Sequence, residues 1–454
     1  MLKKIKERNF HFLLFAFLLG LFIGVNFSFS AKAGESTHKY LDYFHQVYQI
    51  ISSEYVDGAN NKDLFYGAIQ GMIKSLNDPF SRFLDEDSYS ELNEMTTGKF
   101  VGVGVEISIR DGEVVVITPI EDSPAMRAGI KAGDIIFKVN KQIIKDMKIE
   151  EIINLIKGLP GSTVKLYVRR DGVDDILSFD VERAPIKLKS VEYGIIKEYN
   201  IGYIRIKNFG SDTAKDVNDG IRFFNKSGIE KVIVDLRYNP GGLLTAAVSL
   251  SEIFLKKGQV VVSTKGKEGT GNESMFKVEN DPVYNGNVIV LVNKGSASAS
   301  EIFAGAIRDN KRGILVGEKT FGKGSVQKTF NLDKNIGVAV TVAKYYTPAG
   351  ELIHKKGIMP DFEVSEEKLQ KEEIDSLKKI DADKSADAFF KKDMQFNETT
   401  RADFKKYLIN KNIKISDRAA DIFLKNKIGQ YRKKDLYDLE FDNQLSFAIG
   451  KFKK

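Results

Sequence analysis

The sequence contains no cysteine and no tryptophan among its 454 residues, and it has only four histidines. The absence of cysteine excludes disulfides, cysteine-ligated zinc, iron–sulfur clusters, a thiol nucleophile and a lipid-anchored N-terminal cysteine. The histidines are His11, His38, His45 and His354, and no HExxH pair occurs. We therefore expect neither a metal nor a redox cofactor, and much of ordinary catalytic chemistry is excluded.

A basic surface is also lacking. The formal charge is +7, and residues 1–33 contribute five basic side chains and one acidic one. A protein that binds nucleic acid concentrates basic side chains on one face, so this weak excess predicts no nucleic-acid partner. The length suggests about three domains of ~150 residues, and 42% hydrophobic residues are enough for packed cores.

The N-terminus has the pattern of an export signal. Residues 3–8 are mostly basic, residues 9–31 carry no formal charge, and an Ala-Lys-Ala sequence follows at 31–33. This pattern predicts a secretory signal peptide over residues 1–33. The alternative is an uncleaved anchor through residues 10–31, because that stretch is long enough to span a bilayer. Either interpretation places the main body in the periplasm or another extracytoplasmic space.

Four segments with different patterns follow the leader, and together they predict a mixed α/β fold. Apolar residues recur with helical spacing in the first segment, short β-rich runs with Asp-Gly turns fill the second, and strands alternate with helices in the third. The fourth is rich in charge and predicts solvated helices that mediate self-association. The segments are a helical cap (34–97), a β module (98–184), a βαβ core (185–365) and a charged helical appendage (366–454).

The β module resembles a bacterial PDZ domain. The resemblance rests on the run Phe-Val-Gly-Val-Gly-Val at 100–105 and on Asp-Ser-Pro-Ala-Met-Arg-Ala-Gly-Ile-Lys-Ala-Gly-Asp at 122–134. In such a domain a glycine-flanked loop presents backbone N–H groups to a peptide's terminal carboxylate, and the peptide adds a strand to the sheet. The resemblance assigns this role to Gly102, Val103 and Gly104. Alternatively, the glycines only relieve crowding where a strand begins.

Two further motifs contain the candidate catalytic groups. Gly-Ser-Ala-Ser-Ala-Ser-Glu at 295–301 follows an apolar strand, and small residues there let a serine stand at a helix N-terminus; a simple helix cap is the alternative. Thr-Phe-Gly-Lys-Gly-Ser-Val-Gln occupies 320–327. The overlapping run from Gly317 to Lys323 fits the first seven positions of a phosphate-binding P-loop, but Gly324 stands at the eighth, where that loop needs Ser or Thr. We interpret it as a lysine in a glycine-flanked turn.

With Asp-Leu-Arg-Tyr-Asn-Pro-Gly-Gly at 235–242, these motifs make the chain similar to the carboxyl-terminal processing (tail-specific) proteases. The similarity runs from about Val47 to Asp361, where Tyr-Thr-Pro-Ala-Gly (346–350) and Gly-Ile-Met-Pro-Asp (357–361) also fit. It implies a helical cap, an inserted PDZ domain and a ClpP/crotonase-like core. It also implies an exported serine endopeptidase that binds protein or peptide substrates with free C-termini.

The resemblance further implies a serine–lysine dyad. Ser298, the middle serine of its motif, is the expected nucleophile, Lys323 the general base, and Gln327 the residue that orients the lysine. The expected oxyanion donors are backbone amides of Ala299 and of Gly242, with Gly241 as the alternative. On a strand, positions 323 and 327 would lie on one face.

Several alternatives remain at this stage. A Ser–His–Asp triad would need His354, which we interpret as an exposed turn residue. Glu301 either contributes to substrate binding or is only favoured by the helix N-terminus. The chain as a whole is either a protease or an inactive PDZ scaffold of the cell envelope. We also expect a homo-oligomer and allow for an activating adaptor protein.

Overall fold

The computed structural model describes residues 34–110, 112–120, 122–187, 189–367, 369–382, 389–390, 394–429 and 435–452. The expected leader at residues 1–33 lies outside this part. Within the described ranges, no helix is long and apolar enough to cross a membrane. The chain divides into two compact units, Met1–Asp85 and Glu86–Lys454, which we describe separately.

The first unit contains two helices and a short strand: α2 (Gly34–Glu54), α3 (Asn61–Lys74) and β1 (Arg82–Leu84). Phe65 of α3 packs against Phe44 and Tyr48 of α2, with ring centroids 6.1 and 5.0 Å apart. Further apolar side chains of α2 remain exposed, namely Tyr40, Leu41, Val47 and Ile50. The helical segment predicted for 34–97 is therefore helical, although its last helix, α4 (Glu86–Thr97), belongs to the second unit.

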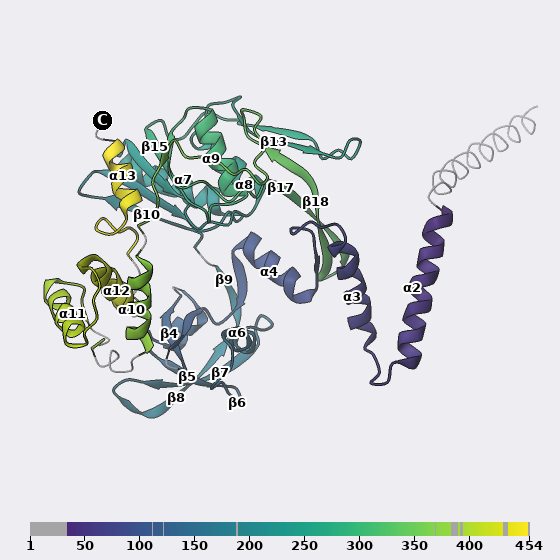
Figure 1. The fold of residues 1–454 in the computed structure, drawn as a ribbon, viewed down its shortest axis with the longest axis horizontal. Helices are drawn as coiled ribbons and strands as arrows, with labels where there is room; N and C mark the ends of the chain where they lie inside the picture. Colours follow the sequence, from purple (N-terminus) through teal and green to yellow (C-terminus); the bar gives the residue numbers. More distant parts are fainter. Residues whose placement is uncertain are drawn as a thin grey trace, which may run out of the picture. The chain divides into compact units, whose positions relative to one another are not determined.

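The PDZ domain follows α4 in the second unit (Figure 1). The chain enters it through β2 (Lys99–Gly102) and leaves through β9 (Ala184–Lys187), and these two strands pair antiparallel. The domain's sheet has the order β3-β4-β5-β7-β8, so β3 is an edge strand. The elements are β3 (Val105–Arg110), β4 (Glu113–Pro119), α5 (Pro124–Ala128), β5 (Ile135–Val139), β6 (Gln142–Ile143), α6 (Ile149–Ile156), β7 (Thr163–Arg170) and β8 (Val173–Glu182).

The predicted βαβ core contains a sheet in the order β10-β11-β12-β15-β16-β19. β10 pairs antiparallel with β11, and every later pair is parallel. The strands are β10 (Val191–Ile196), β11 (Ile201–Ile206), β12 (Lys231–Asp235), β15 (Asn287–Val292), β16 (Ile314–Gly317) and β19 (Phe362–Glu363). The connecting helices are α7 (Thr213–Lys226), α8 (Leu244–Glu252) and α9 (Ala299–Asp309).

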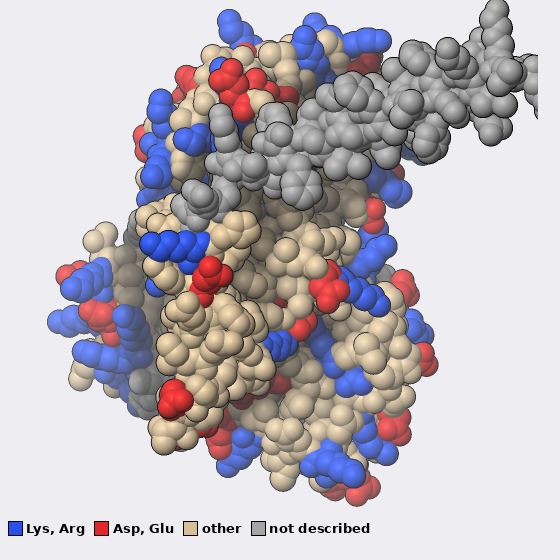
Figure 2. All heavy atoms as spheres, turned by 90° about the vertical axis from the view of Figure 1, so that its right-hand side faces the viewer, with Lys and Arg blue, Asp and Glu red and all other residues tan. Residues whose placement is uncertain are grey.

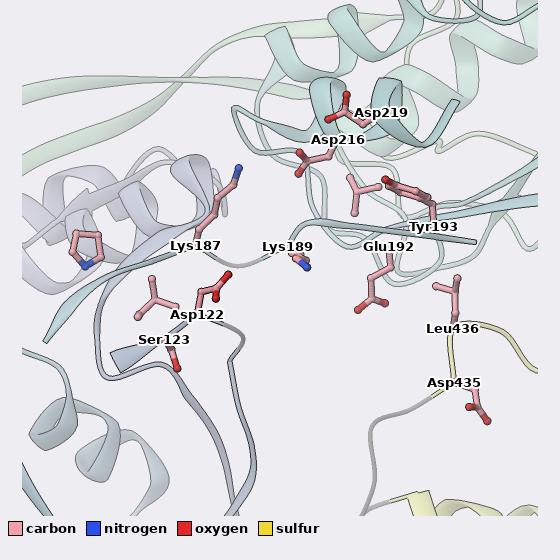
Figure 3. A pocket seen from close by; sticks show the side chains of 13 residues that line it. Asp122, Ser123, Lys187, Lys189, Glu192, Tyr193, Asp216, Asp219, Asp435 and Leu436 are labelled. Carbon is pink, nitrogen blue, oxygen red and sulfur yellow. The ribbon is translucent and has the colours of Figure 1, made fainter. Parts of the chain in front are cut away.

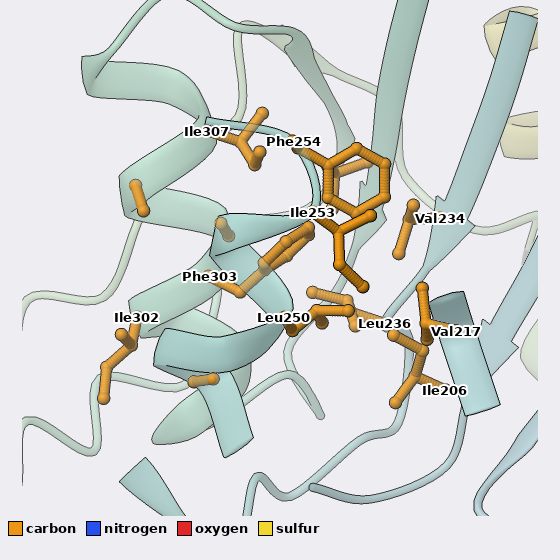
Figure 4. Packing of buried hydrophobic residues seen from close by; sticks show 14 of the residues in the cluster. Ile206, Val217, Val234, Leu236, Leu250, Ile253, Phe254, Ile302, Phe303 and Ile307 are labelled. Atoms are coloured by element: carbon orange, nitrogen blue, oxygen red, sulfur yellow. The ribbon is translucent and has the colours of Figure 1, made fainter. Parts of the chain in front are cut away.

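This sheet is buried on both faces, as its near-continuous apolar strands predict. Alternate residues point to opposite sides. Val232 and Val234 of β12 belong to one cluster with α7, α8 and α9, whose packing around Phe254 and Phe303 is drawn in Figure 4. Ile233, between these two valines, belongs to a second cluster on the opposite face.

An antiparallel sheet of β13, β14, β17 and β18 accompanies the core. β18 (Ile336–Tyr346) pairs with both β17 (Ser325–Asp333) and β13 (Val260–Gly266), and β13 pairs with β14 (Ser274–Lys277). The register of β17 on β18 shifts between Val326 and Gln327. β17 therefore does not follow a simple alternation at its start.

The C-terminal region consists of helices, as predicted, but its last helix is not a solvated appendage. α10 (Lys371–Ala382), α11 (Glu398–Asn410) and α12 (Asp417–Gly429) share a small apolar cluster of their own. α13 (Asn443–Lys451) instead buries Leu445, Ala448 and Ile449 against the second face of the core sheet. These apolar residues recur at positions three and four apart, and the high charge of the surrounding sequence conceals that short pattern. On the face of the molecule in Figure 2, basic and acidic side chains are intermixed.

Candidate active site

Ser298 occupies the turn between β15 and α9. Its backbone has φ 55° and ψ −114°, a conformation that non-glycine residues rarely adopt and that costs about 1–3 kcal/mol. The neighbouring serines of the motif are fully buried: the hydroxyl of Ser296 donates to the carbonyl of Leu236, and that of Ser300 to the carbonyl of Asn239. Ser298 is only partly buried. Of the motif's three serines, it is the accessible one.

The Asn-Pro-Gly-Gly loop lies directly against this turn. A Cβ added at Gly241 would come within 2.7 Å of Ser298 Cβ and 2.8 Å of the Ala299 amide nitrogen. Asn239 fastens the loop, because its carbonyl accepts the Ala297 amide at 3.0 Å and its side-chain Nδ2 donates to the Ile206 carbonyl at 2.8 Å. Gly241 has φ +99°, so both the space and the backbone conformation require glycine here.

The two glycines of the loop use their amides differently. The Gly241 N–H donates to Asn239 Oδ1 at 2.9 Å. Gly242 is exposed, and within the described part of the chain its N–H has no hydrogen-bond acceptor. The Ala299 N–H also has no hydrogen-bond acceptor among the described residues. Ala299 is the first residue of α9, where helix amides have no partner within the helix.

The lysine turn is held by backbone packing on both sides. A Cβ on Gly322 would meet the backbone of Lys355–Gly357 at 3.1–3.2 Å, and one on Gly324 would lie 2.1 Å from the His354 amide nitrogen. The Gly322 carbonyl accepts the Lys355 N–H, and the Gly324 carbonyl accepts the Tyr345 N–H, both at 2.8 Å. The two glycines around Lys323 therefore allow the turn to lie against the 353–357 segment.

Glu301 joins the nucleophile turn to the lysine turn. Its side chain is completely buried in the first turn of α9. Oε2 accepts the backbone N–H groups of Ser298 at 2.9 Å and Lys323 at 2.8 Å. Oε1 accepts the Thr320 hydroxyl at 2.6 Å and the Gly322 N–H at 2.7 Å. One carboxylate thus brings together the backbones of the two expected catalytic residues.

Four donors suit an ionised carboxylate, which only accepts hydrogen bonds. Burial raises the pKa of Glu301 above its ordinary value, and the hydrogen bonds from Thr320, Gly322 and Ser298 act in the opposite direction. Sequence reasoning did not find this bracing role. The capping-box spacing of Ser298 and Glu301, three residues apart, was the available signal.

Gln327 lies on β17, and Lys323 precedes that strand, so the expected alternation on one strand face does not apply to this pair. The Gln327 side-chain Nε2 donates to the hydroxyls of Ser325 at 2.8 Å and Thr341 at 3.2 Å. These bonds fix the orientation of the carboxamide. His354 is in a turn, as predicted, but it is partly buried rather than exposed.

A cluster of charges behind the Asn-Pro-Gly-Gly loop links it to α13. Arg237 makes hydrogen bonds to buried Asp235 and, at 2.5–2.8 Å, to Asp442 at the start of α13. Burial alone would raise the pKa of Asp235, but the charge of Arg237 and hydrogen bonds from Arg237 and Tyr203 hold it below its ordinary value. This contact between residues 205 positions apart was not predictable from any local motif.

The PDZ loop offers a different kind of site. The carbonyls of Val103 and Gly104 accept the amides of Ala125 and Ile120 at 2.8 and 2.9 Å. Because N–H and C=O point in opposite directions across a trans peptide, the Gly104 and Val105 amides face the other way. Gly104 has φ +77°, and a Cβ there would lie 2.3 Å from Ser123 Cβ. Gly102, Val103 and Gly104 all line one cavity.

A larger pocket, of about 1020 Å³, contains none of the expected catalytic residues. Lysine and acidic side chains line it, including Lys187, Lys189, Asp216 and Asp219 (Figure 3). Its size alone does not make it the active site.

The fold and the site together define a class. A partly exposed serine on a strained strand-to-helix turn, beside two available backbone amides, is the arrangement of a serine hydrolase. The attached PDZ domain indicates that its substrates are polypeptides.

Comparisons with known proteins agree with this class. Residues 200–364 match peptidase family S41, residues 115–170 match the PDZ domain, and residues 26–88 match the N-terminal domain of the activating protease CtpB. The carboxy-terminal processing protease CtpA of Bacillus subtilis is 38% identical over 371 residues, which are 81% of this chain and 77% of that protein. A CtpA-like serine protease of Staphylococcus haemolyticus is 36% identical over 409 residues, 89% of this chain and 75% of that one.

Among solved structures, a photosystem II D1 C-terminal processing protease has 31% identity and a TM-score of 0.43, over 71% of this chain and 86% of that one. The chain belongs to peptidase family S41, the CtpA-like C-terminal processing serine proteases. The predicted family and mixed α/β fold class are confirmed.

Proposed function

We propose that this protein is an exported endopeptidase that binds the free C-terminal tail of a protein substrate and cuts it with a Ser298–Lys323 dyad. The observation that carries the proposal is the convergence of the Ser298 and Lys323 backbones on one buried carboxylate oxygen of Glu301. This arrangement holds a nucleophile and a base in one place without a histidine.

In the proposed reaction, Lys323 accepts the Ser298 hydroxyl proton while Oγ attacks the scissile carbonyl. Lys323 then gives that proton to the leaving amine, and an acyl-enzyme on Ser298 remains. A water molecule, deprotonated by Lys323, hydrolyses the ester and regenerates the serine. The serine–lysine pair is a known variant of the serine–histidine–aspartate arrangement.

The base must be neutral to accept a proton. An ordinary lysine has a pKa of about 10.4, so it is almost entirely protonated at neutral pH. Both Glu301 oxygens are already occupied by two donors each, which limits what this carboxylate can do to stabilise an ammonium. With Gln327 Nε2 donating to two hydroxyls, its Oε1 is the atom that would accept an N–H from Lys323 without adding negative charge.

For the oxyanion, we propose the amides of Ala299 and Gly242. Both N–H groups are available within the described residues, and the Gly241 contacts place this loop against the Ala299 nitrogen. Gly241 itself is a poorer candidate because its N–H donates to Asn239. One such donor contributes about 2.7–4 kcal/mol to the transition state of acyl transfer in other enzymes.

Tail recognition is proposed for the PDZ loop at residues 102–104. The edge position of β3 leaves a strand to which an extended peptide can add, and the loop amides of Gly104 and Val105 can bind its carboxylate.

We further propose that the protein is exported and self-associates. Export is supported by the leader pattern of residues 1–33. Self-association is supported by the exposed apolar side chains of α2, because contiguous exposed apolar surface usually marks an interaction site. The match of residues 26–88 to an activating protease's N-terminal domain is compatible with an activating adaptor.

The test is cleavage of an unfolded reporter protein by the purified chain, followed by mass spectrometry. We expect the wild type to cut, Ser298→Ala and Lys323→Ala to be inactive, and amidation of the reporter's C-terminus to slow cutting. Cleavage by Lys323→Ala at the wild-type rate would contradict the dyad. Binding without cleavage by the wild type would favour the alternative, an inactive PDZ scaffold of the cell envelope.

A further inference from the structure

The cavity beside the PDZ loop has one apolar side and one charged end. It encloses about 300 Å³. The apolar side is formed by the edge strand β3 and by α6, and the charged end by Lys157, directly after α6, and Glu94 of α4. The lining residues are Glu94, Phe100, Gly102, Val103, Gly104, Val105, Ile107, Ile153, Ile156 and Lys157.

The charged end is already paired. Lys157 Nζ lies 2.7 and 3.0 Å from the two carboxylate oxygens of Glu94. The side chain of Lys157 is 33% exposed and that of Glu94 is 26% exposed. Glu94 is not part of the PDZ domain's own sheet or helices, because it comes from α4, which precedes the domain in the sequence.

Lys157 is fixed at the end of α6 by a second basic residue. Buried Arg183 donates to the carbonyls of Ile156 at 2.8 Å and Leu155 at 3.0 Å, which are among the last carbonyls of the helix. The Lys157 N–H donates to the Ile153 carbonyl at 2.8 Å. The backbone of Lys157 is therefore held at a capped helix end rather than in a free loop.

Among the described residues that line this cavity, Lys157 is the cation and Glu94 the carboxylate. A peptide's terminal carboxylate placed on the loop amides would need the same ammonium that Glu94 holds. Two carboxylates on one lysine repel each other, so only one of them gains the full interaction.

We propose that Lys157 binds the substrate's C-terminal carboxylate and that Glu94 competes with it as a built-in occupant of the same cation. The inference rests on the proposed tail recognition and adds its regulation. Tail binding exchanges the Glu94–Lys157 pair for a tail–Lys157 pair. The tail that fits has a free carboxylate and an apolar last side chain, which Val105, Ile107 and Ile153 would surround.

The test measures peptide binding by fluorescence anisotropy with full-length protein carrying Ser298→Ala, so that the peptide is not cut. The peptides end in an apolar residue, with the C-terminus either free or amidated. In this background we expect Glu94→Gln to tighten binding of the free peptide about three- to tenfold and to leave the amidated peptide unchanged. Lys157→Gln should weaken the free peptide about tenfold, to near the amidated one.

The matched control is Asp180→Asn, which removes the carboxylate of another ion pair in the PDZ domain, Lys165–Asp180 at 3.3 Å, away from the cavity. It should change neither affinity. The double variant Glu94→Gln/Lys157→Gln should bind like Lys157→Gln alone, since the competitor acts only through that lysine.

The outcomes separate the two proposals. If the Ser298→Ala protein prefers the free peptide but Glu94→Gln does not tighten it, or tightens both peptides equally, the competition is refuted and tail recognition stands. If neither that protein nor Glu94→Gln prefers the free peptide, tail recognition itself is refuted, together with the competition. A preference that emerges only in Glu94→Gln would support the competition most strongly.

Discussion

The catalytic centre and the PDZ cavity each contain a carboxylate that joins two segments, and they do so differently. Glu301 is fully buried and accepts four hydrogen bonds, three of them from backbone amides. Glu94 is partly exposed and has a single lysine as its partner in the cavity. A buried carboxylate whose lone pairs all accept hydrogen bonds holds the segments around it in one arrangement. A partly exposed ion pair contributes about 1 kcal/mol or less to stability, so another carboxylate can replace one of its partners. We therefore expect the catalytic centre to be rigid and the recognition centre to be adjustable.

The largest expected effect is at the buried carboxylate. Glu301→Gln would place an amide N–H against donors that now face an oxygen, so we expect kcat to fall at least about 100-fold and the melting temperature to drop. Glu351→Gln is the control, because that carboxylate is mostly exposed and pairs with Arg308. An active, stable Glu301→Gln protein would contradict the bracing role.

Gly241 tests the same rigidity through the backbone. In Gly241→Ala the new Cβ would lie 2.6 Å from the Ala297 carbonyl oxygen, next to Ser298, and the φ of +99° adds strain. We expect a loss of about 100-fold in kcat with a much smaller change in KM. Gly258→Ala is the matched control, since Gly258 also has positive φ but an open surrounding. Equal effects of the two substitutions would show that backbone strain alone is responsible.

Gln327→Glu is expected to lower activity at neutral pH about tenfold. A carboxylate near Lys323 favours the ammonium and raises its pKa, so less of the base is neutral at pH 7. The pH–rate profile should move to higher pH, with activity recovered in alkaline solution. Unchanged or higher activity at pH 7 would refute this account of the lysine.

Asp442→Asn should act mainly on stability. It removes the charged partner of Arg237 at the N-cap of α13, while Gln444 of α13 keeps its hydrogen bond from Arg237. We expect a loss of about 1–3 kcal/mol in the free energy of unfolding with tail binding unaffected. The pKa of Asp235 is lowered in the folded protein, so its contribution to stability is present above its ordinary value of 3.8 and is lost as the pH falls below it. Urea unfolding at pH 7 and pH 3 measures both effects.

The smallest effect should be at the exchangeable pair. Glu94→Gln is expected to change the affinity for a free C-terminal tail by at most about one order of magnitude. It should leave kcat unchanged on a reporter whose C-terminus is amidated. A large loss of kcat in this variant would remove the contrast between the two carboxylates.

Much of the fold followed from the sequence because strong local patterns carried it. Near-continuous apolar strands and the helices between them predicted the βαβ core. Two motifs predicted the PDZ domain, and a third, glycine-flanked motif predicted the lysine turn. What could not be predicted depended on contacts distant in sequence. Arg237 meets Asp442 across 205 positions, and α13 packs on the core sheet although charged residues surround it.

The site residues show the same division. A serine motif with three similar serines does not reveal that two of them are buried by contacts to the 236–239 loop. The spacing of Lys323 and Gln327 suggested one strand face, but the strand begins after the lysine and its register shifts before the glutamine. Glu301 looked like an ordinary acidic residue at a helix start, but its four donors come from two segments, Ser298 and residues 320–323.

In the proposed mechanism, Lys323 activates Ser298 as a neutral base. It is tested most directly by the rate at which a fluorophosphonate labels the protein as the pH is varied, with the adduct located by mass spectrometry. We expect labelling at Ser298, a labelling rate that rises with an apparent pKa well below that of free lysine, and loss of this labelling in Lys323→Ala. Labelling of Lys323→Ala at the wild-type rate, or an adduct at another serine, would contradict it.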